Sequence, residues 1–185
     1  SLTELMFAED RSCREIPQEQ KYEGEVSSDR YVIAGVYRTG NHSMIYRALD
    51  TVTGKTVAIK KHQHFMPQTN ASPQEMRDAE ARFKREVQIL SNLKHPGIVD
   101  VYGYFFKEDD FQNKPFLVTE LIERDSLEEL IKQGKTFNEQ DARNLILSVG
   151  TPMDYLHTHN GRPIIHRDMK PDNIKVMSAE SEWPH

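Results

Sequence analysis

The stretch His166-Arg-Asp-Met-Lys-Pro-Asp-Asn173 decides how this sequence is read. Pro171 lacks a backbone N–H and is excluded from a regular helix interior, so the stretch is predicted to form a rigid loop. The loop displays an acid, Asp168, a base, Lys170, and an amide, Asn173, at short intervals. Phosphoryl transfer needs such parts, because a carboxylate orients the attacking hydroxyl, a cation meets the phosphate charge and an oxygen atom binds Mg²⁺.

A second set of charged residues lies upstream. Glu86 comes three residues after Phe83 and four before Leu90, so it shares the apolar face of a predicted helix. A carboxylate on that face needs a cation or must change its protonation state. Two cations are candidates: Arg82, one turn earlier on the same helix, and Lys60, at the end of a β-branched strand.

The hydrophobic pattern around these residues predicts an antiparallel sheet. Strands are expected at residues 31–37, 44–48, 56–60, 98–106 and 116–120, with a polar connection over residues 107–114. The predicted fold class is α+β, with five strands, one helix inserted among them, and further helices after the last strand.

Helix boundaries follow from capping signals. Ser72-Pro-Gln-Glu75 and Ser126-Leu-Glu-Glu129 are capping boxes, and Asn138 is a third N-cap. The first helix is expected to run to about Leu93 and the second to end at Gly134. The third carries an apolar stripe made of Ala142, Leu145, Ile146, Val149, Met153 and Leu156.

Composition narrows the class of protein. The chain has 185 residues, 37% hydrophobic and 29% charged, with a net charge of -5. Nucleic acid is not expected as a partner, because phosphate contacts need a basic surface. Cys13 is the single cysteine and cannot form an internal disulfide. No apolar run approaches the roughly 20 residues that cross a bilayer, so no membrane segment is predicted and a cytoplasmic location is expected.

The loop and the strand Val57-Ala-Ile-Lys60 together resemble the protein kinase family, in its serine/threonine form. The resemblance implies that Lys60 holds the α- and β-phosphates of ATP and is positioned by Glu86. It implies that Asp168 is the catalytic base, that Lys170 steadies the γ-phosphate and that Asn173 binds Mg²⁺. ATP and Mg²⁺ are the expected cofactors, and serine or threonine hydroxyls of proteins the expected acceptors.

The resemblance also divides the chain and places the nucleotide. Residues 1–30 are expected to be a flexible extension, 31–121 an N-lobe, and 122–185 a partial C-lobe that ends after the catalytic loop. Thr119 resembles the gatekeeper, the backbone from Glu120 to Ile122 would hold adenine, and Ile45 and Ala58 would pack on its ring. The nucleotide contacts implied are Tyr37, Gly40, Ile45, Ala58, Lys60, Thr119, Glu120 and Ile122.

Two positions depart from the family pattern. The three glycines of the phosphate-binding loop fall on Arg38, Gly40 and Ser43, so one glycine remains. Arg38 would add charge to the phosphates or hold the loop closed. Lys175 stands where the family has an apolar residue beneath adenine, and its stem would serve with the charge reaching water.

After Val176 the chain reaches His185 without an Asp-Phe-Gly motif, whose aspartate the family uses as the principal Mg²⁺ ligand. We expect these residues to be a piece of a longer protein and to have negligible activity alone. The alternative to an active kinase is a pseudokinase or scaffold that binds nucleotide weakly.

Overall fold

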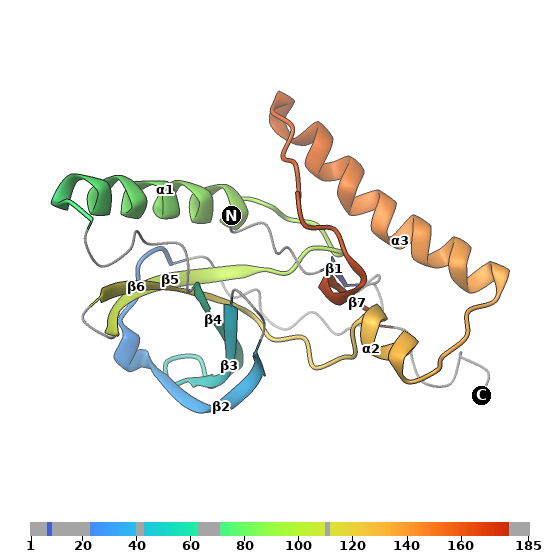
Figure 1. The fold of residues 1–185 in the computed structure, drawn as a ribbon, viewed down its shortest axis with the longest axis horizontal. Coiled ribbons are helices and arrows are strands. Elements are labelled where there is room, and N and C mark those ends of the chain that lie inside the picture. Colours follow the sequence, from blue (N-terminus) through green and yellow to red (C-terminus); the bar gives the residue numbers. More distant parts are fainter. Residues whose placement is uncertain (1–6, 9–22, 40–42, 63–70, 110–111, 178–185) are drawn as a thin grey trace.

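The computed structural model describes residues 7–8, 23–39, 43–62, 71–109 and 112–177 (Figure 1). The predictions for Gly40 and Cys13 lie outside these residues. Within them, no helix is both long and apolar enough to cross a membrane.

A five-stranded antiparallel sheet forms the first half, as predicted, with the order β2-β3-β4-β6-β5. Its strands are β2 (Tyr31–Thr39), β3 (Ser43–Asp50), β4 (Thr56–His62), β5 (Val101–Asp109) and β6 (Gln112–Glu120). The helix α1 is inserted in the chain between β4 and β5 and lies along one side of the sheet (Figure 1).

The β5–β6 hairpin is longer than the hydrophobic pattern predicted. The segment taken for a polar connection continues the ladder, with Lys107 opposite Lys114 and Asp109 opposite Gln112. Backbone pairing needs no apolar side chains where a hairpin extends into solvent, so polarity alone did not mark the strand ends. At the other end, β5 begins at Val101, and Ile98 is buried in the turn that precedes it.

Helix α1 (Pro73–Ser91) starts at the predicted capping box. The Ser72 hydroxyl accepts from the Glu75 N–H at 3.3 Å, and the Glu75 carboxylate accepts from the Ser72 N–H at 2.7 Å. Phe83, Val87 and Leu90 are buried and pack with residues of β5 and β6 in one core cluster. The helix is therefore fixed to the sheet by its apolar face.

The second half contains α2 (Leu127–Lys132), α3 (Glu139–Thr158), and the short 3₁₀ helices η2 (His159–Gly161) and η3 (Pro171–Asn173). Both predicted N-caps are present, at Ser126 and Asn138. Strand β7 (Ile174–Lys175) pairs in parallel with β1 (Phe7–Ala8). Helix α3 runs through Pro152 and leaves Ile146 70% exposed.

Residues 23–26 extend the sheet along β5. The Glu23 N–H donates to the Tyr102 carbonyl at 3.0 Å and the Val26 N–H to that of Tyr104 at 2.8 Å, while the Tyr104 N–H donates to the Gly24 carbonyl at 3.0 Å. Gly103 lies beneath this pairing, where a Cβ atom would come within 2.9 Å of the Gly24 oxygen. A side chain there would force the two segments apart.

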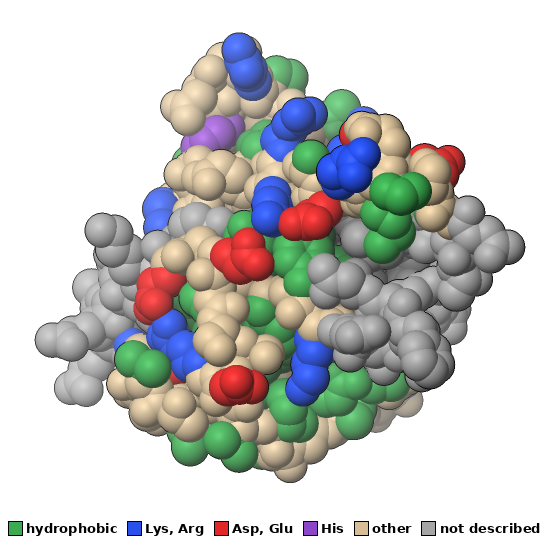
Figure 2. All heavy atoms as spheres, turned by 90° about the vertical axis from the view of Figure 1, so that its left-hand side faces the viewer, with side chains coloured by type: hydrophobic (Ala, Val, Ile, Leu, Met, Phe, Trp, Pro, Cys, Tyr) green, Lys and Arg blue, Asp and Glu red, His purple; other side chains and the backbone are tan. Residues whose placement is uncertain are grey.

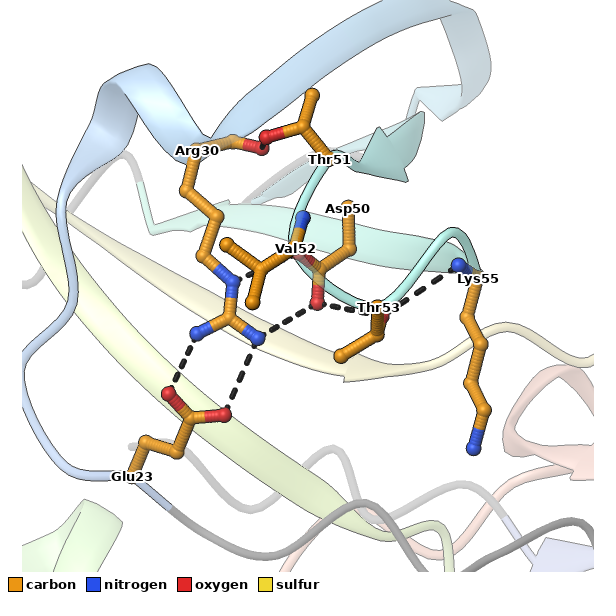
Figure 3. Close-up of polar contacts among 7 residues, drawn as sticks. All are labelled: Glu23, Arg30, Asp50, Thr51, Val52, Thr53 and Lys55. Atoms are coloured by element: carbon orange, nitrogen blue, oxygen red, sulfur yellow. Dashed lines mark hydrogen bonds and ion pairs between the residues drawn. The ribbon is translucent and has the colours of Figure 1, made fainter.

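A polar network holds the short 3₁₀ helix η1 (Ser28–Arg30) to the β3–β4 turn (Figure 3). Arg30 donates from Nε and one terminal nitrogen to the two oxygens of Asp50, both at 2.7 Å, and also pairs with Glu23. Asp50 is 0% exposed and further accepts from the Thr53 hydroxyl at 2.8 Å and the Val52 N–H at 3.0 Å. The buried carboxylate is thus compensated by charge and by hydrogen bonds.

The surface beside the β5–β6 hairpin mixes both signs of charge. Figure 2 shows Lys and Arg side chains alternating with Asp and Glu on this face, with apolar side chains between them. On α1, Lys84 pairs with Glu80 at 2.8 Å and with Glu25 at 3.3 Å.

Candidate functional site

The register of the sheet brings four of the predicted site residues to one face. Lys60 on β4 lies opposite Ile45 on β3, and Ala58 lies opposite Thr119 on β6. Residues directly opposite in an antiparallel pair point to the same side, and so do residues two apart in a strand. Lys60, Ile45, Ala58 and Thr119 therefore share one face, with Lys60 only 9% exposed.

This face is the one that α1 covers. Leu117, the β6 partner of Lys60, belongs to the same core cluster as Phe83 and Val87 of α1. Glu86 is half-buried and lies between these two helix residues in the chain. Lys60 and Glu86 thus belong to facing elements, and their direct pairing stays a prediction.

The chain segment between β6 and α2 contains the predicted adenine-binding backbone. Glu120 is fixed at its start, since its N–H donates to the Asp100 carbonyl at 2.9 Å. Ile122 is buried against Val99. The Tyr37 hydroxyl, from β2, donates to the Ile122 carbonyl at 3.2 Å. Two predicted nucleotide residues that are far apart in sequence are therefore in contact.

The catalytic loop holds its three predicted residues together. The Asn173 side-chain amide donates to the backbone oxygen of Asp168 at 2.8 Å and to its carboxylate at 3.0 Å. The Lys170 ammonium lies 3.1 Å from the same carboxylate oxygen. The Asp168 N–H donates to Nδ1 of the buried His166 at 3.3 Å. Arg167 adopts a φ of 63°, which turns the chain sharply before Asp168.

These contacts set the charge state of Asp168. Partial burial raises the pKa of the carboxyl, but hydrogen bonds from Lys170 and Asn173 outweigh it and leave the pKa below its usual range. The group is therefore ionised at neutral pH. An ionised carboxylate beside a cation can accept a hydrogen bond from a hydroxyl and then its proton.

Asn173 fits the predicted role of Mg²⁺ ligand. Both of its side-chain hydrogen bonds to Asp168 use Nδ2 and not Oδ1, and amide oxygens are ligands that Mg²⁺ accepts. Among the residues that the structure describes, no three His, Cys, Asp or Glu side chains gather to hold a metal ion.

Arg38 and Lys175, the two residues that depart from the family pattern, both lie beside Glu129 of α2. One terminal nitrogen of Arg38 lies 2.9 Å from Glu129 of α2 and 2.8 Å from Asp172 of η3. The Lys175 ammonium lies 3.8 Å from the other Glu129 oxygen and 5.8 Å from the centre of the Tyr37 ring. Residues of β2, α2, η3 and β7 are thus joined in one cluster.

The prediction that the Lys175 charge reaches water is wrong. The side chain is 2% exposed, and its ammonium lies between Glu129 of α2 and the Tyr37 ring of β2. Burial, reinforced by the Arg38 charge, lowers the pKa of its ammonium, and Glu129 opposes this only in part. Nothing in the local sequence separates a buried lysine at the end of this loop from one that extends to solvent.

Sequence reasoning also missed Glu129 and Asp172 as partners of Arg38. Glu129 was assigned only to the capping box, in which its Oε2 does accept from the Ser126 N–H at 2.7 Å. Its Oε1 remains for Arg38. The signal in the sequence was Arg38 itself, because a cation in place of a loop glycine indicates that carboxylate partners lie nearby.

Comparison with known proteins agrees with this arrangement. A family model described as the protein kinase domain matches residues 36–181. The serine/threonine-protein kinase tousled-like 2 of Mus musculus is 32% identical over 152 residues, 82% of this chain and 20% of that protein. A probable serine/threonine-protein kinase PknB of Lactococcus lactis is 31% identical over 84% of the chain and 23% of its own length. An Aurora kinase of Yarrowia lipolytica is 31% identical over 80% and 36%. The chain thus spans about a fifth to a third of these relatives.

Proposed function

The chain belongs to the protein kinase family, with serine/threonine kinases among its relatives, and from that membership we propose that the protein transfers the γ-phosphate of Mg-ATP to serine or threonine hydroxyls of other proteins. The observation that carries the proposal is the catalytic loop. Asp168, Lys170 and Asn173 are held within hydrogen-bond distance of one another, with the carboxylate ionised.

The chemistry assigns one role to each of these groups. The acceptor hydroxyl hydrogen-bonds to Asp168, its oxygen attacks the γ-phosphorus, and the bond to the bridging β–γ oxygen breaks as ADP leaves. The proton of the hydroxyl passes to the carboxylate. Lys170 stabilises the charge on the moving phosphoryl group, while Asn173 is the proposed ligand of Mg²⁺, which neutralises phosphate charge when bound.

The nucleotide is proposed to lie beside the α1-facing side of the sheet. Support comes from the register, which groups Lys60, Ile45, Ala58 and Thr119 on that side. The segment up to Ile122, which follows β6 directly, is held to β2 by the Tyr37 hydroxyl. A lysine ammonium binds two phosphates through charge-assisted hydrogen bonds, and a half-buried carboxylate on the facing helix would orient the ammonium. We assign that carboxylate to Glu86.

A second candidate function is a pseudokinase that serves as a scaffold. Two observations favour it: Arg38 replaces a loop glycine and is engaged by carboxylates, and a buried lysine occupies the position beneath the base. Both features depart from the pattern with which the family binds nucleotide. The intact catalytic loop favours the enzyme.

The test is phosphate transfer by the full-length protein. We expect label from the γ-phosphate of ATP to appear on a generic protein substrate, dependent on Mg²⁺ and confined to serine and threonine after hydrolysis. Incorporation on tyrosine would contradict the assigned acceptor. Absence of incorporation, with a chain that remains folded, would favour the scaffold. By the same reasoning, the 185 residues alone should transfer little phosphate, because the Asp-Phe-Gly aspartate is not among them.

A further inference from the structure

Arg38 joins the sheet to two separate elements of the second half. It stands near the end of β2, paired in register with Ile45, in the strand that leads into the predicted phosphate-binding loop. Its guanidinium contacts Glu129 on α2 and Asp172 in η3, and α2 and η3 pack against each other. One side chain therefore ties the edge strand of the N-lobe to a helix and to the catalytic loop of the C-lobe.

The surroundings make this tie stronger than an ordinary surface ion pair. The Arg38 side chain is 26% exposed, and both carboxylates are partly shielded. One guanidinium shared by two carboxylates forms a network, and networks contribute more than isolated exposed pairs. The carboxylates are also fixed in place: Glu129 caps α2 through its other oxygen, and Asp172 follows the rigid Pro171.

The residue before Arg38 makes a parallel connection. Tyr37 donates to the Ile122 carbonyl, and its ring lies over the Lys175 ammonium. Two consecutive residues of β2 thus fasten the same strand end to the chain segment after β6, to α2, to η3 and to β7. An adenine base that binds to the backbone at Ile122 must either break these contacts of β2 or enter beside them.

We propose that Arg38, Glu129 and Asp172 form a salt-sensitive clasp that holds β2 against the C-lobe and sets how fast nucleotide enters and leaves. The inference rests on the proposed function for its nucleotide, while the clasp itself does not. Phosphate oxygens carry the same kind of charge as the two carboxylates, so a triphosphate competes with them for Arg38. A glycine at this position, as in the family pattern, makes no such contact.

The first experiment needs no nucleotide. Amide hydrogen exchange of residues 31–39 in the full-length protein is compared between wild type and Arg38→Ala at an ionic strength of about 0.05 M. We expect at least about threefold faster exchange in the variant, which corresponds to a modest ion-pair network. At about 0.5 M salt the wild type should approach the variant, because screening weakens the pairs. The central strand, residues 56–62, is the internal reference.

Arg47→Ala is the matched control. Arg47 lies on the neighbouring strand β3 and pairs at 2.6 Å with Glu123, which lies between β6 and α2, and both side chains are about half-exposed. Its loss should leave exchange of residues 31–39 at the wild-type rate. Asp172→Asn removes one of the two carboxylates and should also accelerate exchange of residues 31–39. The double variant with Arg38→Ala should show a smaller increase than the sum of the two single increases in opening free energy. Unchanged exchange in both Arg38→Ala and Asp172→Asn would overturn the clasp.

The second experiment measures Mg-ATP exchange with a fluorescent ATP analogue. In Arg38→Ala both association and dissociation should accelerate by about threefold or more, since the clasp opposes opening in either direction. Faster amide exchange with unchanged nucleotide rates would overturn the gating role. A wild-type protein that shows the salt-sensitive clasp but binds no analogue would instead contradict the proposed function and leave the clasp standing.

Discussion

Replacing Asp168 by Asn in the full-length protein is expected to lower phosphate incorporation by about a thousandfold. An amide of the same shape cannot take the proton of the acceptor hydroxyl. It also removes the negative charge that Lys170 contacts at 3.1 Å. The measurement is the initial rate of transfer from labelled ATP to a generic substrate at saturating Mg-ATP.

Two comparisons make the result specific. Asp154→Asn, an exposed substitution on α3, should leave the rate unchanged. The Asp168→Asn variant should retain most of the thermal stabilisation by Mg-ATP, because binding uses other groups. A variant that keeps more than about a tenth of the rate would show that Asp168 is not the base.

Replacing Arg30 by Ala is expected to cost about 3–5 kcal/mol of unfolding free energy, the range for breaking a buried ion pair. The change removes the guanidinium that donates to both oxygens of Asp50, whose carboxylate is 0% exposed. Chemical denaturation by urea measures the loss. Arg82→Ala is the control, since Arg82 is exposed on α1 and makes one long hydrogen bond of 3.4 Å; it should change stability by less than about 0.5 kcal/mol.

The same pair predicts a pH dependence. Burial raises the pKa of Asp50, but hydrogen bonds from Arg30, Thr53 and Val52 outweigh it and hold the pKa far below its ordinary value. A lowered folded pKa means that the stabilisation is present above about pH 4 and is lost as the pH falls further. The difference between wild type and Arg30→Ala should therefore narrow under acid. If the unfolding free energies of wild type and Arg30→Ala differ by less than about 1 kcal/mol at pH 7, the proposed contribution of the Arg30–Asp50 pair to stability is wrong.

The sequence predicted best those elements whose boundaries are fixed by contacts between residues close together in the chain. A capping box is completed within four residues, so Ser72, Ser126 and Asn138 could be identified as helix starts without any tertiary information. Strand ends are different, because a ladder continues wherever backbones stay adjacent. The β5–β6 hairpin beyond Lys107 therefore exceeded the apolar run.

The candidate site shows the same difference between contacts that are local in sequence and contacts between residues far apart. The loop of residues 166–173 is a compact motif whose hydrogen bonds join residues at most five apart, so the sequence alone could group Asp168, Lys170 and Asn173 in one loop. The Arg38 contact with Glu129 spans 91 residues and the Tyr37 contact with Ile122 spans 85. Such pairs depend on how β2 is placed against α2, η3 and the segment after β6, which no local pattern encodes. The burial of Lys175 has the same origin.

The central claim is that Lys60, on the side of the sheet that α1 covers, meets the phosphates of ATP. Thermal unfolding of the full-length protein with saturating Mg-ATP tests it most directly, in wild type, Lys60→Met and Lys61→Met. Successive strand residues point to opposite faces, so Lys61 is the matched control. The wild type and Lys61→Met should gain about 3 °C or more, and Lys60→Met far less, because a ligand stabilises in proportion to its affinity. Equal gains in all three proteins, or none in the wild type, would contradict the account.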